Sequence, residues 1–248
     1  MNARFHAPEA RQGERAVLGD EEARHLTRVL RLDVGAVVAV FDGRGGEFHA
    51  VVESIGKHQV EIRVGEPKVA SAEARIAIAL LQAVLKGDKM DDVVRDAVMI
   101  GVAAIQPVVT ARTEVSLATL ERARRRERWE RIAIAAAKQC GRAVVPPVRD
   151  PVDVAVVLSA GEAGLAPGPK VMLVEPGASP GTVPLSGLDV LAPSQASLLI
   201  GPEGGWTPEE VAAAAASWRL VTMGGRTLRA DAMATIAVAA LFTKWGEF

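Results

Sequence analysis

The feature that most restricts the fold lies near the carboxyl terminus, where two short apolar runs each end in glycine. Residues 197–200 are followed by Gly-Pro-Glu-Gly-Gly at 201–205, and residues 220–222 are followed, after Met223, by Gly224 and Gly225. A helical pattern follows each glycine segment. Strand, glycine loop and helix is the arrangement in which an α/β protein exposes backbone N–H and C=O groups to a ligand. The two loops therefore predict a ligand site.

The first loop ends in a strong helix start. Thr207 is an expected N-cap, Pro208 suits the first helical position, and Glu210 completes a capping box. A tight strand-to-helix turn is the plain alternative for one such loop. A second loop close by, followed by Arg226 and Arg229, favours a binding site.

Standard nucleotide motifs do not fit these glycines. Their spacing, at 201, 204 and 205, is not G-x-G-x-x-G, and no Lys-Ser or Lys-Thr pair follows as a P-loop requires. The mismatch argues against a phosphate-cradling loop and favours another adenosine-type ligand that is held by backbone groups.

The segments GPEGGWTPEE at 201–210 and MGGRTLRAD at 223–231 resemble the two signature loops of the RsmE-type 16S rRNA uracil-N3 methyltransferases, a branch of the SPOUT superfamily. The resemblance implies an α/β domain whose carboxyl-terminal loops are threaded into a trefoil knot that binds S-adenosylmethionine. Knots are nearly absent from proteins, so only the resemblance predicts one. It also implies methylation of N3 of a specific uridine, the equivalent of 1498, in 16S rRNA of the small ribosomal subunit.

Site residues follow from the same resemblance. Arg229 is expected to polarise the uracil with Asp231 orienting it, while Asp231 and Glu203 stay open as acceptors of the N3 proton. Asp231 is equally expected as a cap of the last helix. The cofactor is expected to contact mainly the backbone, where glycine permits close approach, at Leu199, Ile200, Gly201, Pro202, Glu203, Gly204, Met223, Gly224 and Leu228.

Length and composition limit the number of domains and the classes of protein to which the chain can belong. The chain has 248 residues, 49% of them hydrophobic and 24% charged, enough for one large domain or two smaller ones. Its net charge of -1 means that contacts with RNA must come from local clusters. A single cysteine, Cys140, excludes an internal disulfide, and with four histidines makes a metal site unexpected. The longest apolar run, 232–242, is too short for a membrane span, so we expect a cytoplasmic protein.

Residues 1–70 are predicted to form a small β-barrel. A helix is expected from Asp20, with strands at 36–41, 47–52 and 60–64 joined by glycine-containing turns at 42–46 and 56–58. The run His-Leu-Thr-Arg-Val-Leu-Arg resembles the PUA-like RNA-binding domain of the same family, which makes Arg28 and Arg31 candidate phosphate contacts. An ordinary solvated helix face is the alternative.

After a linker at 65–74, residues 74–248 are predicted to form the SPOUT domain. Strands at 75–81 and 103–109 enclose a helix at 88–100, and further strands are expected at 171–174, 197–200 and 220–222. Such alternation predicts a mostly parallel sheet covered on both faces. Segments 159–170 and 176–196 are expected to be loops.

Residues 121–131 carry six arginines and three glutamates, a local charge of +3. The alternatives are the solvated side of a helix with i,i+4 ion pairs and an RNA-facing patch. Beyond this run, Gln139 and Arg142 match the family's A-x-Q-x-x-R segment, although both could simply cap the helix end. The RNA contacts predicted outside the first domain are Arg112, Gln139, Arg142 and Arg226.

Departures from the family at three positions keep other functions open. Asp96 and Met99 stand where relatives have Lys and Glu, and Asp231 stands where they have Glu. A non-catalytic RNA-binding protein of this fold, a methyltransferase with another RNA target, and an unrelated nucleotide-dependent enzyme are the alternatives. The resemblance also implies a homodimer, for which the apolar helix expected from residue 232 is a candidate contact.

Overall fold

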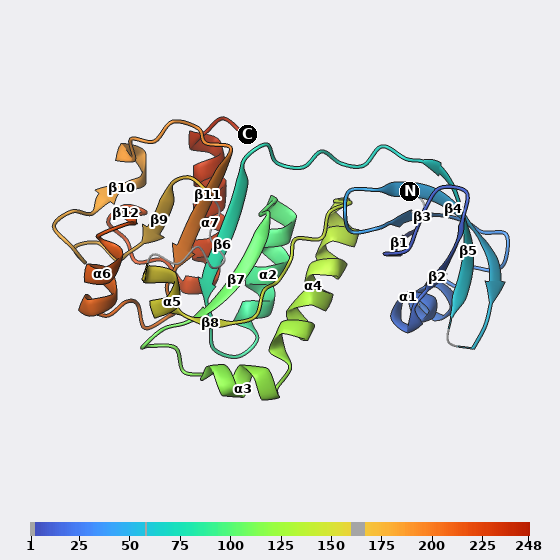
Figure 1. The fold of residues 1–248 in the computed structure, drawn as a ribbon, viewed down its shortest axis with the longest axis horizontal. Coiled ribbons are helices and arrows are strands. Elements are labelled where there is room, and N and C mark those ends of the chain that lie inside the picture. Colours follow the sequence, from blue (N-terminus) through green and yellow to red (C-terminus); the bar gives the residue numbers. More distant parts are fainter. Residues whose placement is uncertain (1–2, 58, 160–166) are drawn as a thin grey trace. The chain divides into compact units, whose positions relative to one another are not determined.

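The computed structural model describes residues 3–57, 59–159 and 167–248, and the chain divides into two compact units (Figure 1). The first unit comprises Met1–Glu73 with Ile134–Val145, and the second comprises Ala74–Ala133 with Pro146–Phe248. The sequence pattern placed 134–145 in the second domain, whereas contacts in the structure group this segment with the first unit.

The first unit is built on a curled five-stranded sheet that forms half a barrel. Its strand order is β1-β3-β4-β5-β2, with β1 parallel to β3 and the other pairs antiparallel. Alternate side chains enter one core that includes Phe5, Leu18 and Ile62. The strands are β1 (Arg4–His6), β2 (Arg15–Leu18), β3 (Val37–Phe41), β4 (Glu47–Ile55) and β5 (Val60–Pro67).

The helix expected from Asp20 changes type within a few residues. A short α1 (Asp20–Arg24) continues as a π-helical turn, η1 (His25–Val29), after which Arg31 has a left-handed φ of 52°. The His25 Nδ1 atom lies 2.8 Å from Lys138 Nζ, and Lys138 also pairs with Glu22 at 2.7 Å. The histidine of the His-Leu-Thr-Arg-Val-Leu-Arg run is thus engaged within the unit.

The end of α4 (Arg125–Cys140) belongs to the first unit because Arg4 binds it. The Arg4 guanidinium donates to the carbonyl oxygens of Ala137 at 2.9 Å and Arg142 at 2.7 Å. Carbonyl groups at a helix end lack intrahelical partners, so a guanidinium there satisfies them and complements the helix dipole. Arg4 also pairs with Glu47 at 3.1 Å.

The second unit contains a seven-stranded sheet in which every pairing is parallel, as the alternating pattern predicts. The order is β10-β12-β9-β11-β6-β7-β8, so β9 lies between β11 and β12. The strands are β6 (Ala77–Ala83), β7 (Ala104–Val109), β8 (Val152–Asp153), β9 (Lys170–Leu173), β10 (Val183–Pro184), β11 (Gln195–Ile200) and β12 (Arg219–Thr222).

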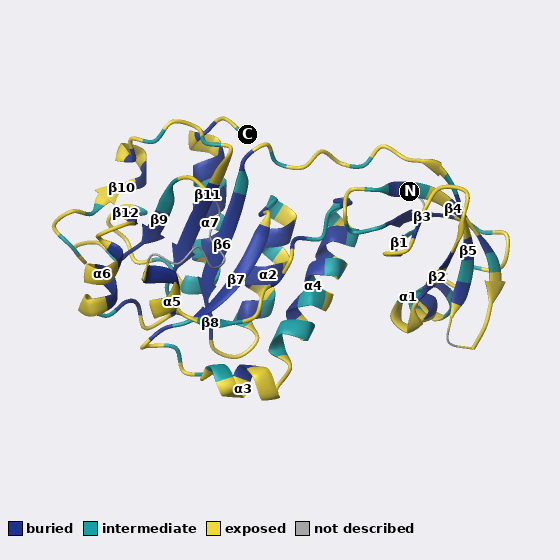
Figure 2. Cartoon of the chain, in the orientation of Figure 1, coloured by how far each residue is buried: buried dark blue, intermediate teal, exposed yellow. Residues whose placement is uncertain are grey.

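Helices cover both faces of this sheet, and its central strands are buried (Figure 2). On one face α5 (Val154–Leu158) and α6 (Pro208–Ala214) share a core with Leu81, Leu199 and Leu220. On the other face α2 (Lys89–Ile100) packs against α7 (Ala230–Lys244), which also contacts β6 and β11. The unit also contains α3 (Leu117–Arg122).

Two of the segments predicted as loops differ in how much of their structure is described. The expected loop at 176–196 contains the short β10 and a 3-10 turn, η2 (Leu185–Gly187), before β11 begins. The loop expected at 159–170 falls mostly outside the described residues, as does His58 of the turn at 56–58. None of the described helices is both long enough and apolar enough to cross a bilayer.

Candidate active site

A pocket lies at the carboxyl ends of β9, β11 and β12, where the glycine loops predict a ligand site. The last residue of β9 and the segment after it contribute Leu173, Val174, Glu175 and Pro176, and the last residue of β11 and the segment after it contribute Ile200, Gly201, Pro202 and Trp206. The last residue of β12, the segment after it and the start of α7 contribute Thr222, Met223, Arg226, Thr227, Leu228, Ala230 and Met233.

Five of the nine predicted cofactor contacts line this pocket. They are Ile200, Gly201, Pro202, Met223 and Leu228. Leu199 is fully buried in the sheet core because alternate strand residues point to opposite faces. Glu203, Gly204 and Gly224 are not lining residues, and the contribution of Glu175, Trp206 and Met233 was not predicted.

Gly201 and Gly205 are required by close approach in the first loop. A Cβ atom on Gly201 would lie 2.9 Å from the Trp206 ring, whose Nε1 donates to the Leu173 carbonyl oxygen at 2.7 Å. Gly205 has a left-handed φ of +67°, and a Cβ atom there would lie 2.0 Å from Glu175 Oε1. Both positions therefore exclude larger residues on steric grounds.

Glu203 fastens the first loop to the segment that follows β6. Its Oε1 accepts hydrogen bonds from Lys89 Nζ at 2.7 Å and from the Lys86 backbone N at 3.3 Å. Burial alone would raise the pKa of Glu203, but the hydrogen bonds from Lys89 and the backbone outweigh it and lower the pKa below its ordinary value. A carboxylate held in this way is a poor proton acceptor, which weakens Glu203 as the candidate base.

The turn after β7 is fastened to the same loop. Arg112 Nη1 donates to the Gly204 carbonyl oxygen at 2.8 Å, and Glu210 accepts from the Ala111 backbone N at 2.9 Å. Glu210 also completes the predicted capping box with Thr207, which the structure confirms. Arg112, predicted to contact RNA, thus has one hydrogen bond to the loop and an exposed side chain.

The second loop, 223–229, carries the predicted catalytic arginine. Arg229 is 76% exposed, and its Nε and Nη2 atoms donate to Asp231 at 3.0 and 2.6 Å. The guanidinium lowers the pKa of Asp231 and the carboxylate raises the pKa of Arg229. An ionised Asp231 suits the orientation of Arg229 better than acceptance of a proton.

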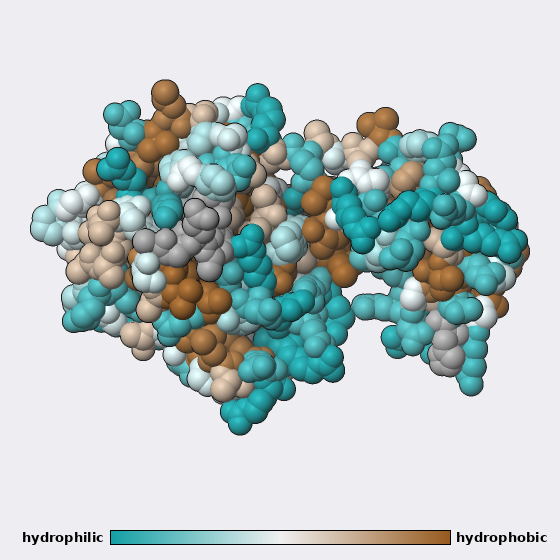
Figure 3. Space-filling view, in the orientation of Figure 1, coloured by the Kyte–Doolittle hydropathy of each residue, from teal (hydrophilic) through white to brown (hydrophobic). Residues whose placement is uncertain are grey.

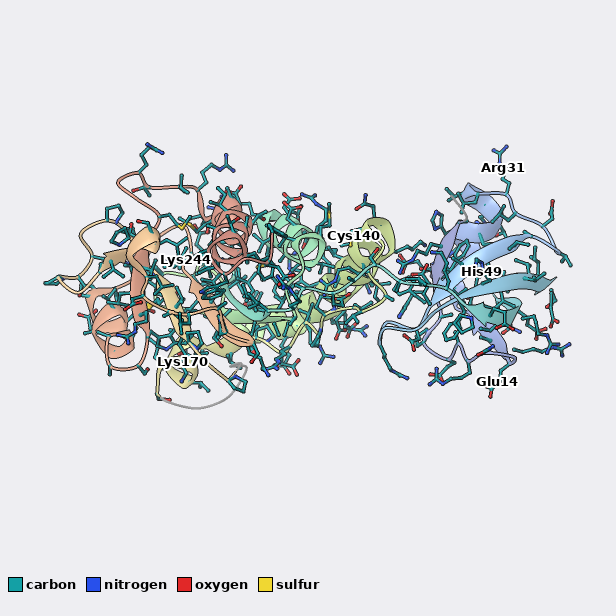
Figure 4. The ribbon with its side chains drawn as sticks, turned by 90° about the horizontal axis from the view of Figure 1, so that it is seen from above. Glu14, Arg31, His49, Cys140, Lys170 and Lys244 are labelled. Atoms are coloured by element: carbon teal, nitrogen blue, oxygen red, sulfur yellow. The ribbon has the colours of Figure 1, made fainter. Side chains whose placement is uncertain are left out.

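The predicted RNA contacts of the first unit differ in exposure. Arg28 and Arg31 are exposed, and the Arg31 side chain points away from the sheet (Figure 4). Gln139 is exposed and lines a hollow with Arg4 and other residues of the first unit. Arg142 is 6% exposed and pairs with Glu73, so contact with RNA would require this ion pair to open.

The arginines of the run 121–131 pair with a carboxylate of the run itself and with carboxylates from other segments of the second unit. Arg126 pairs with Glu130 at 2.8 Å and with Asp150 at 3.1 Å, and Arg128 pairs with Asp88 at 3.0 Å. Hydrophilic side chains gather over the first turns of α4 (Figure 3). These pairs favour the solvated-face alternative for 121–131.

The two departures on α2 lie away from the pocket. Asp96 accepts a hydrogen bond from Arg95 at 2.7 Å, and Met99 is 44% exposed. Neither residue lines the pocket. Among the described residues, no cluster of three His, Cys, Asp or Glu side chains could hold a metal ion.

Comparison with known proteins identifies the family. Residues 72–242 match the model of an RNA methyltransferase domain, and residues 18–65 match that of an RNA methyltransferase PUA domain. The chain is 32% identical over 249 aligned positions to ribosomal RNA small subunit methyltransferase E of Synechocystis, covering 94% of this chain and 74% of the relative. This chain belongs to the ribosomal RNA small subunit methyltransferase E family.

Solved structures of methyltransferase E and a similar enzyme have the same fold. The Neisseria gonorrhoeae methyltransferase E, bound to S-adenosylmethionine, has a TM-score of 0.86 and 32% identity, covering 99% of this chain and 98% of its own. A Legionella pneumophila methyltransferase bound to the same cofactor has a TM-score of 0.88 and 30% identity, covering 98% of both chains. The resemblance carried by the two glycine loops is thus confirmed.

Proposed function

We propose that this protein transfers a methyl group from S-adenosylmethionine to N3 of one uridine, the equivalent of 1498, in 16S rRNA. The observation that carries the proposal is the pocket between two glycine loops with Arg226 on its wall and Arg229 just beyond it. Two relatives named ribosomal RNA small subunit methyltransferase E support the proposal, and the structure of one of them contains bound S-adenosylmethionine.

The pocket residues fit the cofactor. Ile200, Met223 and Leu228 offer apolar surface to a flat adenine ring, and the absence of a side chain on Gly201 leaves backbone groups accessible. When bound, S-adenosylmethionine supplies an electrophilic methyl group on a positively charged sulfur. The protein must then hold the uracil in line with it.

Uracil N3 carries a proton at neutral pH and becomes a good nucleophile only when that proton is lost, here to solvent water; the bond from sulfur to methyl then breaks as the bond from N3 to methyl forms. Arg229 is proposed to donate hydrogen bonds to a uracil carbonyl oxygen, where negative charge develops. Asp231, ionised and bound to two guanidinium nitrogens, keeps Arg229 in place. Arg226, exposed on the pocket wall, is proposed to contact the RNA beside the target base.

Binding of the ribosomal RNA is proposed to use both units. Arg28, Arg31 and Gln139 supply exposed polar groups on the first unit, and Arg112 supplies one on the second. We also propose a cytoplasmic homodimer with α7 at the interface and a trefoil knot around β11 and β12. The target uridine must leave any base pair, because pairing buries N3.

The decisive experiment uses small ribosomal subunits from cells that lack this gene. Purified protein and S-adenosylmethionine are added, and 16S rRNA fragments are examined by mass spectrometry for a methyl group at uridine N3. We expect one modified position. Cofactor binding without methyl transfer would support the non-catalytic alternative, and a methyl group on another nucleotide would support a different target.

A further inference from the structure

Glu175 is an acidic residue in the pocket whose carboxylate has no partner. It follows β9, the strand that lies between the strands carrying the two glycine loops. Within the part of the chain that the structure describes, no hydrogen bond or ion pair reaches its side-chain oxygens. By contrast, Glu203, Glu210 and Asp231 are all engaged by neighbouring groups.

The carboxylate lies against the backbone of the first glycine loop. An ideal Cβ atom on Gly205 would lie 2.0 Å from Glu175 Oε1 and 3.0 Å from its Cδ. The missing side chain of Gly205 therefore makes room for the carboxylate. Among the described lining residues, Glu175 and Arg226 are the two that carry charge.

A half-buried carboxylate without a partner is unfavourable for the protein alone. Removal of a charge from water costs free energy unless an opposite charge or hydrogen-bond donors replace the lost hydration. Arg226 is exposed, and among the pairs formed by the described residues none joins it to Glu175. A cationic ligand in the pocket would supply the missing partner.

We propose that Glu175 recognises the positive charge on the sulfur of the methyl donor, an inference that rests on the proposed function. S-adenosylmethionine has one more positive charge than S-adenosylhomocysteine, because the sulfur of the product is a neutral thioether. The carboxylate therefore attracts the donor more strongly than the product. Glu175 is a specificity residue that favours donor binding and product release.

The test measures binding of both molecules by isothermal titration calorimetry. Glu175→Gln removes the charge and keeps the shape. We expect about tenfold weaker binding of S-adenosylmethionine and at most about a twofold change for S-adenosylhomocysteine, as for the loss of one charged partner. Glu121→Gln, the same change at an exposed position on α3, is the matched control and should alter neither affinity.

Three results would overturn the proposal. An equal loss for both molecules would place Glu175 on a group that they share, such as the ribose hydroxyls or the ammonium. Unchanged binding with lost methyl transfer would assign Glu175 to proton transfer, and unchanged binding and activity would leave it without a role. Failure of the wild-type protein to bind S-adenosylmethionine would contradict the proposed function itself. If the wild-type protein binds it and Glu175→Gln leaves the ratio of the affinities for S-adenosylmethionine and S-adenosylhomocysteine unchanged, only the Glu175 proposal is contradicted.

A second variant separates charge from folding. Glu175→Asp keeps the charge and should retain a preference for S-adenosylmethionine over S-adenosylhomocysteine, at reduced affinity for both. Ligand-free Glu175→Asp should unfold at the wild-type temperature, and ligand-free Glu175→Gln at that temperature or slightly above it, because Gln removes a half-buried charge that has no partner. A Glu175→Asp protein that lost the preference would contradict recognition by charge, even if it folded normally.

Discussion

The two glycine loops of the pocket follow β11 and β12, the strands on either side of β9 in one sheet, yet they are held in very different ways. Loop 201–205 is fastened through Glu203 to Lys89, through Gly204 to Arg112, and by the capping box that follows it. Loop 223–229 has a hydrogen bond from Thr222 Oγ1 to the Gly224 carbonyl oxygen at 3.0 Å and the Arg229–Asp231 pair. Its glycines have open space around them.

This contrast assigns different tasks to the loops. A loop fixed by several hydrogen bonds presents its backbone in one position, which suits a cofactor that every catalytic cycle must bind alike. An exposed loop with few contacts opens at low free-energy cost and can adapt to a large RNA. We therefore expect changes in the first loop to alter cofactor binding, and changes at the exposed arginines of the second loop, whose Met223 and Leu228 also line the pocket, to alter methyl transfer.

The largest effect is expected from Arg229→Ala in the second loop. Loss of a charged donor at the developing negative charge should lower kcat by about 10²- to 10³-fold. Calorimetry should show unchanged affinity for S-adenosylmethionine, since Arg229 is outside the pocket lining. Single-turnover methylation of small subunits measures the first quantity. A comparable loss of cofactor affinity would contradict the division between the loops.

A smaller effect, on binding instead of chemistry, is expected from Gly205→Ala. The left-handed φ of +67° and the contact with Glu175 should weaken S-adenosylmethionine binding by roughly 10- to 100-fold. Gly225→Ala is the matched control in the other loop, because a Cβ atom there meets nothing within 4 Å. Calorimetry on both variants measures the difference. Equal losses would mean that the loops are equally constrained.

The sequence predicted the loops because glycine, the capping box and the apolar strands are all local signals. Thr207, Pro208 and Glu210 define a helix start by their spacing alone, and the structure has α6 beginning at Pro208. The alternation of strands and helices likewise predicted the parallel sheet. These features depend on residues that are close together in the chain, so the sequence pattern predicts them.

What the sequence could not predict depends on contacts between distant segments. The partners of Arg128, at Asp88 and Asp91, come from the start of α2 and cancel a charge that looked unbalanced along the chain. Glu175 lies in a Gly- and Pro-rich stretch, and only the insertion of β9 between β11 and β12 brings it into the pocket. Local periodicity predicts neither the order of strands in a sheet nor the contacts between segments that are distant in the chain. The sequence therefore could not predict the ion pairs of Arg128 or the position of Glu175.

The smallest effect is expected from the ion pair that fastens the first loop. Lys89→Met removes the 2.7 Å contact with Glu203, an exposed pair of the kind worth about 0.5 kcal/mol, so affinity for S-adenosylmethionine should fall by about twofold. Lys86→Met is the matched control, because its side chain pairs with Glu114 while its backbone N–H still donates to Glu203.

The pH dependence of this pair has a definite sign. The pKa of Glu203 is lowered in the folded protein, so the pair stabilises the loop fully above the ordinary glutamate pKa and loses this stabilisation as pH falls through the lowered value. Thermal unfolding of wild-type and Lys89→Met proteins should therefore differ at neutral pH and converge in acid. A difference in unfolding temperature that persisted below the lowered pKa would show that Lys89 stabilises the loop by packing. The ion pair with Glu203 would then not be one of the contacts that hold the first loop more firmly than the second.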